Sequence, residues 1–124
     1  MANPPLVSVV DDDESVRESL QSLLRSVGFA VKVFGSAEEF LNANYSGDSD
    51  CLILDVRMPG MSGIELHRRL VASGCEVPVV FITAHGSDEG VRSRALKDGA
   101  VAYLVKPFSE DALLNAVRTA LGSK

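Results

Sequence analysis

The sequence has no long apolar run and no excess of basic residues. Its uninterrupted apolar segments are only a few residues long, whereas a membrane-spanning helix needs roughly 18. Residues 1–5 also lack the basic and apolar segments of a secretory signal peptide. Lys and Arg number 12 against 17 Asp and Glu, and the net charge of −5 argues against direct binding of nucleic acid. We therefore expect a cytoplasmic protein without membrane contact.

Cysteine is scarce as well. Cys51 and Cys75 are the only two, and their spacing matches no metal-binding or redox motif. We expect both to be reduced thiols, as is usual in the cytosol. A chain of 124 residues with 46% hydrophobic content can build a core without cross-links. We therefore expect one domain over residues 1–124, with its core between about residues 6 and 121 and no effector domain.

Short apolar segments alternate with helical patterns five times along the chain. The predicted strands are Leu6–Val10, Ala30–Val33, Cys51–Leu54, Val79–Ile82 and Val101–Val105. The helical patterns between and after them include an apolar stripe from Val16 to Val27, capping boxes at Ser36 and Ser62, and a capped helix after Ser109. The helix around Gly90 has a thin apolar stripe and a cap at Ser87 or Asp88, so we expect it to be the most mobile.

Alternating strands and helices predict an α/β fold with a parallel sheet covered on both faces. For five strands the flavodoxin-like, doubly wound (βα)5 arrangement with strand order 2-1-3-4-5 is favoured. Lys32 lies within the second strand, which suits an edge position because a charge is tolerated there.

Polar residues follow the predicted strands at the same edge of the sheet. Asp11 and Asp12 follow the first strand, Asp55 the third, Thr83 the fourth and Lys106 the fifth. Ligands bind at this edge in such folds. Like charges about 4 Å apart repel by roughly 4 kcal/mol at an effective dielectric constant of about 20, so the carboxylates call for a cation. Oxygen ligands without His or Cys favour Mg²⁺, or Mn²⁺ in its place.

This residue set is suited to phosphoryl transfer onto a carboxylate. A carboxylate such as Asp55 can attack phosphorus and form an acyl phosphate. Lys106 supplies a mobile positive charge, and the Thr83 hydroxyl can donate to a phosphoryl oxygen. Metal and lysine would stabilise the charge on the transferring group. We therefore predict that Asp55 is phosphorylated.

Four segments together resemble the receiver domain of two-component response regulators: VVDDD at 9–13, DVRMPGMSG at 55–63, TAHG at 83–86 and KPF at 106–108. The resemblance covers the chain from about Leu6 to Leu121. The TAHG turn and the run GAVAYLVKPF at 99–108 look closest to the FixJ-type subgroup of nitrogen-fixation regulators.

The resemblance implies a role for each matching residue. Asp55 would accept the phosphoryl group of a sensor histidine kinase. Asp12, Asp55 and the backbone carbonyl of Arg57 would bind Mg²⁺, and Asp11 would act through water. Lys106 and Thr83 would contact the phosphoryl group.

The resemblance also implies how the domain signals. Tyr103 would turn inward as Thr83 moves, switching the surface of the fourth helix and fifth strand. Arg57 and His85 would tune dephosphorylation, and the bond before Pro107 would be cis, as a tight turn in the site also suggests. Phosphorylation would promote a homodimer and control an effector outside this chain, one that binds DNA. The domain would be a switch and not a turnover enzyme.

Plainer interpretations exist for several of these residues. One of Asp11–Asp13 is expected to cap the first helix. Taken alone, Lys106 would be a solvated charge and Tyr103 a core residue. His67 is expected to be a partly buried packing residue. Arg92, Arg94 and Lys97 are expected to form a solvated helix face.

Two other functions fit parts of the pattern. A phosphatase of the haloacid-dehalogenase type also uses an Asp nucleophile, but it needs a second Asp two residues later, where this chain has Arg57. A flavin-binding module of the same fold needs a Ser-, Thr- or Gly-rich phosphate loop after the first strand. Three aspartates stand there instead, and they would repel a phosphate unless a metal intervened.

Overall fold

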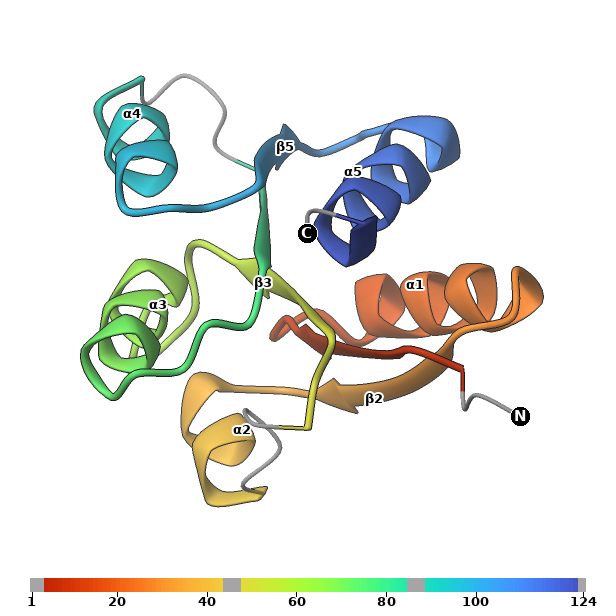
Figure 1. Cartoon of the computed structure of the whole chain (residues 1–124), viewed down its shortest axis with the longest axis horizontal. Coiled ribbons are helices and arrows are strands. Elements are labelled where there is room, and N and C mark those ends of the chain that lie inside the picture. Colours follow the sequence, from red (N-terminus) through yellow and green to blue (C-terminus); the bar gives the residue numbers. More distant parts are fainter. Residues whose placement is uncertain (1–3, 44–47, 85–88, 123–124) are drawn as a thin grey trace.

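The computed structural model describes residues 4–43, 48–84 and 89–122, which form one five-stranded sheet flanked by helices (Figure 1). The strands are β1 (Leu6–Val10), β2 (Ala30–Phe34), β3 (Cys51–Asp55), β4 (Val79–Thr83) and β5 (Ala102–Val105). All neighbouring pairs are parallel, and the order is β2-β1-β3-β4-β5. The predicted fold class and strand order are confirmed. Lys32 is exposed on the edge strand β2, as expected.

Five helices cover the two faces of the sheet: α1 (Glu14–Ser26), α2 (Ala37–Ala43), α3 (Gly63–Ala72), α4 (Glu89–Lys97) and α5 (Glu110–Gly122). In Figure 1, α1 and α5 lie to the right of the sheet, and α2, α3 and α4 lie to its left. No helix within the described part of the chain is both long and apolar enough to cross a bilayer.

Each face of the sheet has its own hydrophobic core. Neighbouring residues of a strand point to opposite faces, so Val9 and Ile53 belong to the core under α1 and α5, whereas Val10 and Leu54 belong to the other. The first core includes Leu20, Leu24, Leu113 and Val117, and the second Phe40, Leu66, Leu70 and Phe81. All five residues of β3 are buried, as expected for a strand covered on both faces.

Side-chain caps start the helices where the sequence predicts them. Asp13 accepts a hydrogen bond from the Ser15 N–H at the start of α1, and Ser62 accepts one from the Glu65 N–H in α3. The Ser36 and Ser109 hydroxyls cap α2 and α5 in the same way. The predicted caps of α4, Ser87 and Asp88, lie outside the described residues.

Four predicted strand boundaries differ from the observed ones by one residue: β2 ends at Phe34 and not at Val33, β5 begins at Ala102 and not at Val101, and β3 and β4 each extend one residue further. Asp55 and Thr83 are the last residues of β3 and β4 instead of the first residues after them. The neighbouring strands extend the ladder to these positions, because Asp55 pairs with Ile82 and Thr83 with Val105. As a result, the side chains of Asp55 and Thr83 project from the sheet and not from a loop.

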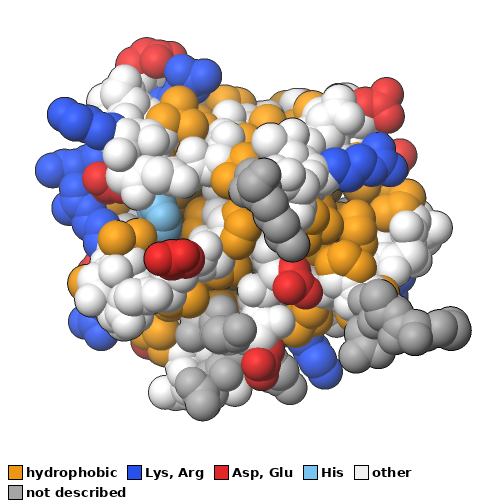
Figure 2. All heavy atoms as spheres, in the orientation of Figure 1, with side chains coloured by type: hydrophobic (Ala, Val, Ile, Leu, Met, Phe, Trp, Pro, Cys, Tyr) orange, Lys and Arg blue, Asp and Glu red, His pale blue; other side chains and the backbone are white. Residues whose placement is uncertain are grey.

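The solvated helix face that the sequence predicts also agrees with the structure. Figure 2 shows Lys and Arg side chains gathered on the side that carries α3 and α4. The exposed basic residues of these helices are Arg68, Arg69, Arg92, Arg94 and Lys97. Arg68 pairs with Asp98 at 3.3 Å, and both side chains remain partly accessible to water.

Candidate functional site

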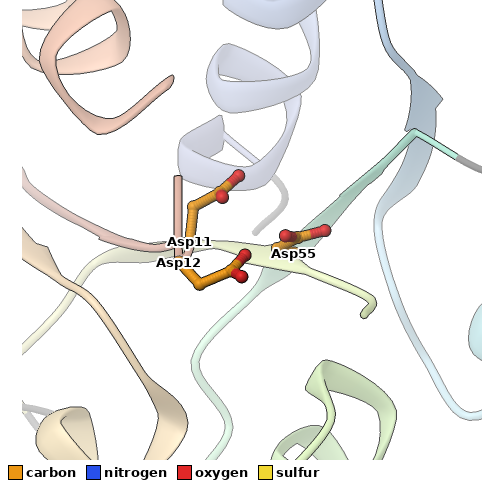
Figure 3. Close-up of side chains that lie close together, drawn as sticks. All are labelled: Asp11, Asp12 and Asp55. Atoms are coloured by element: carbon orange, nitrogen blue, oxygen red, sulfur yellow. The ribbon is translucent and has the colours of Figure 1, made fainter. Parts of the chain in front are cut away.

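Three carboxylates gather where β1 and β3 end (Figure 3). Asp11 and Asp12 follow β1, and Asp55 ends β3, the strand next to β1. One oxygen from each lies within 4.8 Å of those of the other two. Asp11 and Asp55 are buried, whereas Asp12 is exposed. The site is therefore open to solvent on the side of Asp12 and closed behind the other two.

Lys106 brings the fifth strand into the same site. Its Nζ lies 2.9 Å from Asp11 Oδ2 and 3.9 Å from Asp55 Oδ2. Its backbone N–H donates to the carbonyl of Thr83, at 2.7 Å. The Thr83 side chain is fully buried at the end of β4, and the Lys106–Pro107 peptide bond is cis. The structure therefore places Lys106 beside Asp55, with Thr83 at the end of the intervening strand β4.

The backbone around Asp55 is fixed by both of its neighbours. The Val56 N–H donates to the carbonyl of Ile82 in β4, and the carbonyl of Val56 accepts from the Gly63 N–H at the start of α3. A Cβ atom on Gly63 would collide with the Asp55 carbonyl oxygen. Only glycine therefore allows α3 to start this close to the strand that carries Asp55.

Asp11 is held by three hydrogen bonds, one to its backbone carbonyl and one to each of its two carboxylate oxygens. Its Oδ1 accepts from the Asp13 N–H at 2.9 Å, and its Oδ2 accepts from Lys106. Its carbonyl accepts from Arg17 Nη1 at 2.7 Å. This contribution of Arg17 cannot be predicted from the sequence, because nothing in the residue order shows that the side chain folds back onto the end of β1.

The electrostatics of the site disfavour a charged Asp55. Burial raises the pKa of the Asp55 carboxyl to about 7, and the neighbouring charge of Asp11 and a hydrogen bond with Asp11 act in the same direction. Lys106 and a hydrogen bond from the Arg57 backbone lower this pKa, but they only partly offset the rise. Two buried carboxylates with one ammonium group leave negative charge in excess.

This arrangement fits a small, hard cation. The donors are carboxylate oxygens, with no His or Cys in the cluster. Mg²⁺ prefers such oxygen ligands and retains several waters, which the exposed side of Asp12 can accommodate. A divalent charge would also relieve the repulsion that raises the pKa of Asp55.

The remaining predicted residues have distinct positions. The Arg57 side chain is exposed, while its backbone faces Asp55. Tyr103 is buried, and its ring lies 6.4 Å from that of Phe81. His67 is also buried and packs edge-on against Phe81, which confirms its predicted packing role. His85 lies outside the described residues.

Comparison with known sequences agrees with this geometry. The family model of the response regulator receiver domain matches residues 7–118. The chain is 48% identical over 116 residues to the response regulator protein TmoT of Ectopseudomonas mendocina, covering 94% of this chain and 52% of TmoT. It is 47% identical to the transcriptional regulatory protein FixJ of Azorhizobium caulinodans, covering 94% of this chain and 54% of FixJ. The chain thus spans about half the length of these curated relatives.

Solved structures give the same relationship. The chain superimposes on the crystal structure of FixJ-N with a TM-score of 0.85 and 40% identity, covering 97% of this chain and 95% of the other. The response regulator StyR matches with a TM-score of 0.88 and 53% identity, covering 95% of this chain and 59% of StyR. The chain therefore belongs to the response regulator receiver domain family of two-component systems and resembles its FixJ-type members.

Proposed function

We propose that the protein is a phosphorylation-activated switch in which Asp55 accepts a phosphoryl group from the phosphohistidine of a sensor kinase. The observation that carries this proposal is the convergence of three carboxylates and the Lys106 ammonium group on one strand edge. Asp55 is the member of this set that ends a central strand and is flanked by both charge types.

In this proposal Asp12, Asp55 and the backbone carbonyl of Arg57 hold Mg²⁺ or Mn²⁺, and Asp11 acts through water. When bound, the ion neutralises charge on the phosphoryl oxygens and on the carboxylates. Asp11 has a second task, since it orients the Lys106 ammonium group from 2.9 Å. The cluster supports this assignment through its all-oxygen donor set.

The transfer itself requires little covalent chemistry from the protein. An Asp55 carboxylate oxygen attacks phosphorus, the phosphorus–nitrogen bond to the kinase histidine breaks, and the imidazole leaves with that electron pair. Lys106 moves from its carboxylate partners toward the phosphoryl oxygens, and the Thr83 hydroxyl donates to one of them. Arg57 and His85, each two residues beyond a functional residue, tune how fast water later removes the group.

We further propose that the phosphorylated site acts on the surface of α4 and β5. Thr83 and Tyr103 transmit the change, because Thr83 ends β4 and pairs through its carbonyl with Lys106 at the end of β5. The switched surface promotes a homodimer and acts on a DNA-binding output outside this chain, in the cytoplasm. The transcriptional role of relatives such as FixJ supports this output.

Phosphorylation can be tested directly on this chain. The intact mass is measured after incubation with acetyl phosphate, with and without Mg²⁺. We expect one added phosphoryl group that requires the metal and is lost in Asp55→Asn. Modification that persists in Asp55→Asn would refute the assignment of Asp55, and steady release of phosphate from many different substrates, over many turnovers, would favour a phosphatase instead.

A further inference from the structure

The tip of the loop between β3 and α3 is bound to helix α2. The carboxylate of Glu38, in the first turn of α2, accepts a hydrogen bond from the backbone N–H of Met61 at 3.0 Å. These residues are 23 positions apart in the sequence. A hydrogen bond from the N–H of Glu38 itself and, to a lesser extent, the bond from Met61 lower the pKa of the Glu38 carboxyl, so this group is charged at neutral pH.

The backbone of the loop is shaped for this contact. Gly60 precedes Met61 and has a φ of +77°, a conformation that glycine adopts without the strain that other residues incur. A Cβ atom at Gly60 would lie 2.8 Å from Glu38 Oε2. Glycine therefore satisfies two conditions here, the turn of the loop and the close approach of the carboxylate.

Between this tip and the base of the loop lies Arg57. The base is fixed by Val56, which bonds to β4 and to the start of α3. The Arg57 backbone N–H bonds to the Asp55 carboxylate, while its side chain is exposed. The position of the Arg57 backbone therefore depends on how firmly the two ends of the loop are held.

We propose that Glu38 is a positioning residue for the Asp55 site: by holding the loop tip through Met61, it keeps the backbone of Arg57 facing Asp55 and the bound Mg²⁺. Glu38 is not part of the carboxylate cluster, so it acts through the loop. A preorganised loop binds a ligand more tightly, because less conformational freedom is lost on binding. This inference rests on the proposed function, since it assumes that the Arg57 carbonyl is a metal ligand.

Glu39 provides a matched control. It is the next residue of α2 and is also exposed, but its carboxylate accepts from the Gly35 N–H at 2.9 Å, in the loop before α2. Replacing either glutamate changes the net charge by the same amount. A general electrostatic effect on Mg²⁺ would therefore appear in both variants, and an effect through the β3–α3 loop only in Glu38 variants.

The test compares Mg²⁺ affinity by isothermal titration calorimetry in the wild type, Glu38→Ala, Glu38→Gln and Glu39→Ala. We expect Glu38→Ala to weaken Mg²⁺ binding about threefold relative to Glu39→Ala, as suits the loss of an exposed bond to a charged acceptor. Glu38→Gln retains an oxygen acceptor and should lie in between. Amide exchange at Met61 should accelerate in Glu38→Ala, with an unchanged melting temperature.

Phosphorylation kinetics separate positioning from chemistry. With acetyl phosphate, the Glu38→Ala rate should fall at low Mg²⁺ and return to the wild-type rate at saturating Mg²⁺. Equal Mg²⁺ affinities of Glu38→Ala and Glu39→Ala would overturn the inference. A wild-type protein that binds Mg²⁺ in a Glu38-dependent way but takes no phosphoryl group would contradict the proposed function and still support the positioning role.

Discussion

Two buried titratable side chains, Asp55 and His67, show how differently burial can be used in one domain. Burial raises the pKa of Asp55 and lowers that of His67, so in both cases it favours the neutral form. The two lie at different edges of the sheet. Asp55 ends β3, whereas His67 borders a pocket of about 380 Å³ next to the starts of β4 and β5.

Their surroundings distinguish a site from a packing position. Asp55 has a second buried carboxylate and an ammonium group beside it, and the two carboxylates share that one ammonium group. His67 has an aromatic ring 5.4 Å away; burial lowers its pKa, and the charge of Asp98 acts in the opposite direction without reversing the shift. A shifted pKa therefore indicates function here only when several charged groups converge on it.

The largest expected effect concerns the stability of the metal-free protein. A native pKa of about 7 for Asp55 lies above the ordinary value of 3.8. The folded state therefore binds more protons than the unfolded state between these values, and stability falls as pH rises through this window. We expect Asp55→Asn to raise the free energy of unfolding by about 2 kcal/mol at pH 8 in EDTA.

Urea denaturation followed by circular dichroism measures this gain at pH 8 and pH 6. The gain should shrink at pH 6, because most of the folded wild-type protein then has a protonated, neutral Asp55 and is no longer destabilised by a buried charge. Asp13→Asn is a suitable control, since Asp13 caps α1 from an exposed position and its pKa is lowered instead. A gain that does not depend on pH would contradict the electrostatic explanation.

A smaller effect should follow the addition of Mg²⁺. An ion that binds only the folded state stabilises it by about 1.4 kcal/mol at a free concentration ten times its dissociation constant. We expect this stabilisation in the wild type at pH 8 and little of it in Asp55→Asn, measured as a shift in melting temperature. An equal shift in both proteins would show that the ion does not use Asp55.

Much of this comparison can be predicted from the sequence. Four of the five short apolar segments end next to a polar residue, and in a parallel sheet those ends meet at one edge, so Asp11, Asp12, Asp55 and Lys106 could be grouped without coordinates. Helix starts were predictable for a similar reason, since Asp13 and Ser62 stand directly before their helices and bond to nearby N–H groups.

The contacts between side chains and the backbone of other elements could not be predicted from the sequence. Glu38 looks like an ordinary acidic residue in a first helical turn, and only the fold shows that Met61 lies against it. From the sequence, Arg17 likewise looks like an ordinary polar residue of α1, and only the structure shows that its side chain reaches the Asp11 carbonyl. Such contacts depend on the packing of α1 and α2 against the sheet, which no local pattern encodes.

The smallest expected effect concerns His67, and its pH dependence is opposite to that of Asp55: the stability falls as pH falls. Because its native pKa is lowered, the unfolded state binds the proton first, and the stability that neutral His67 contributes is lost as pH falls below the ordinary value of 6.5. We expect His67→Leu to lose less stability than the wild type between pH 7 and pH 5 in urea denaturation. The reference protein and the His67→Leu variant would both carry His85→Gln, so that His67 is the one histidine that titrates in the reference and none titrates in the variant. Subtracting the two free energies of unfolding at each pH removes the contribution of Asp55, which both proteins share. If the free energies of unfolding of the two proteins changed in parallel with pH, His67 would not be held neutral by burial. Asp55 would then be the one of the two side chains whose pKa is shifted by burial.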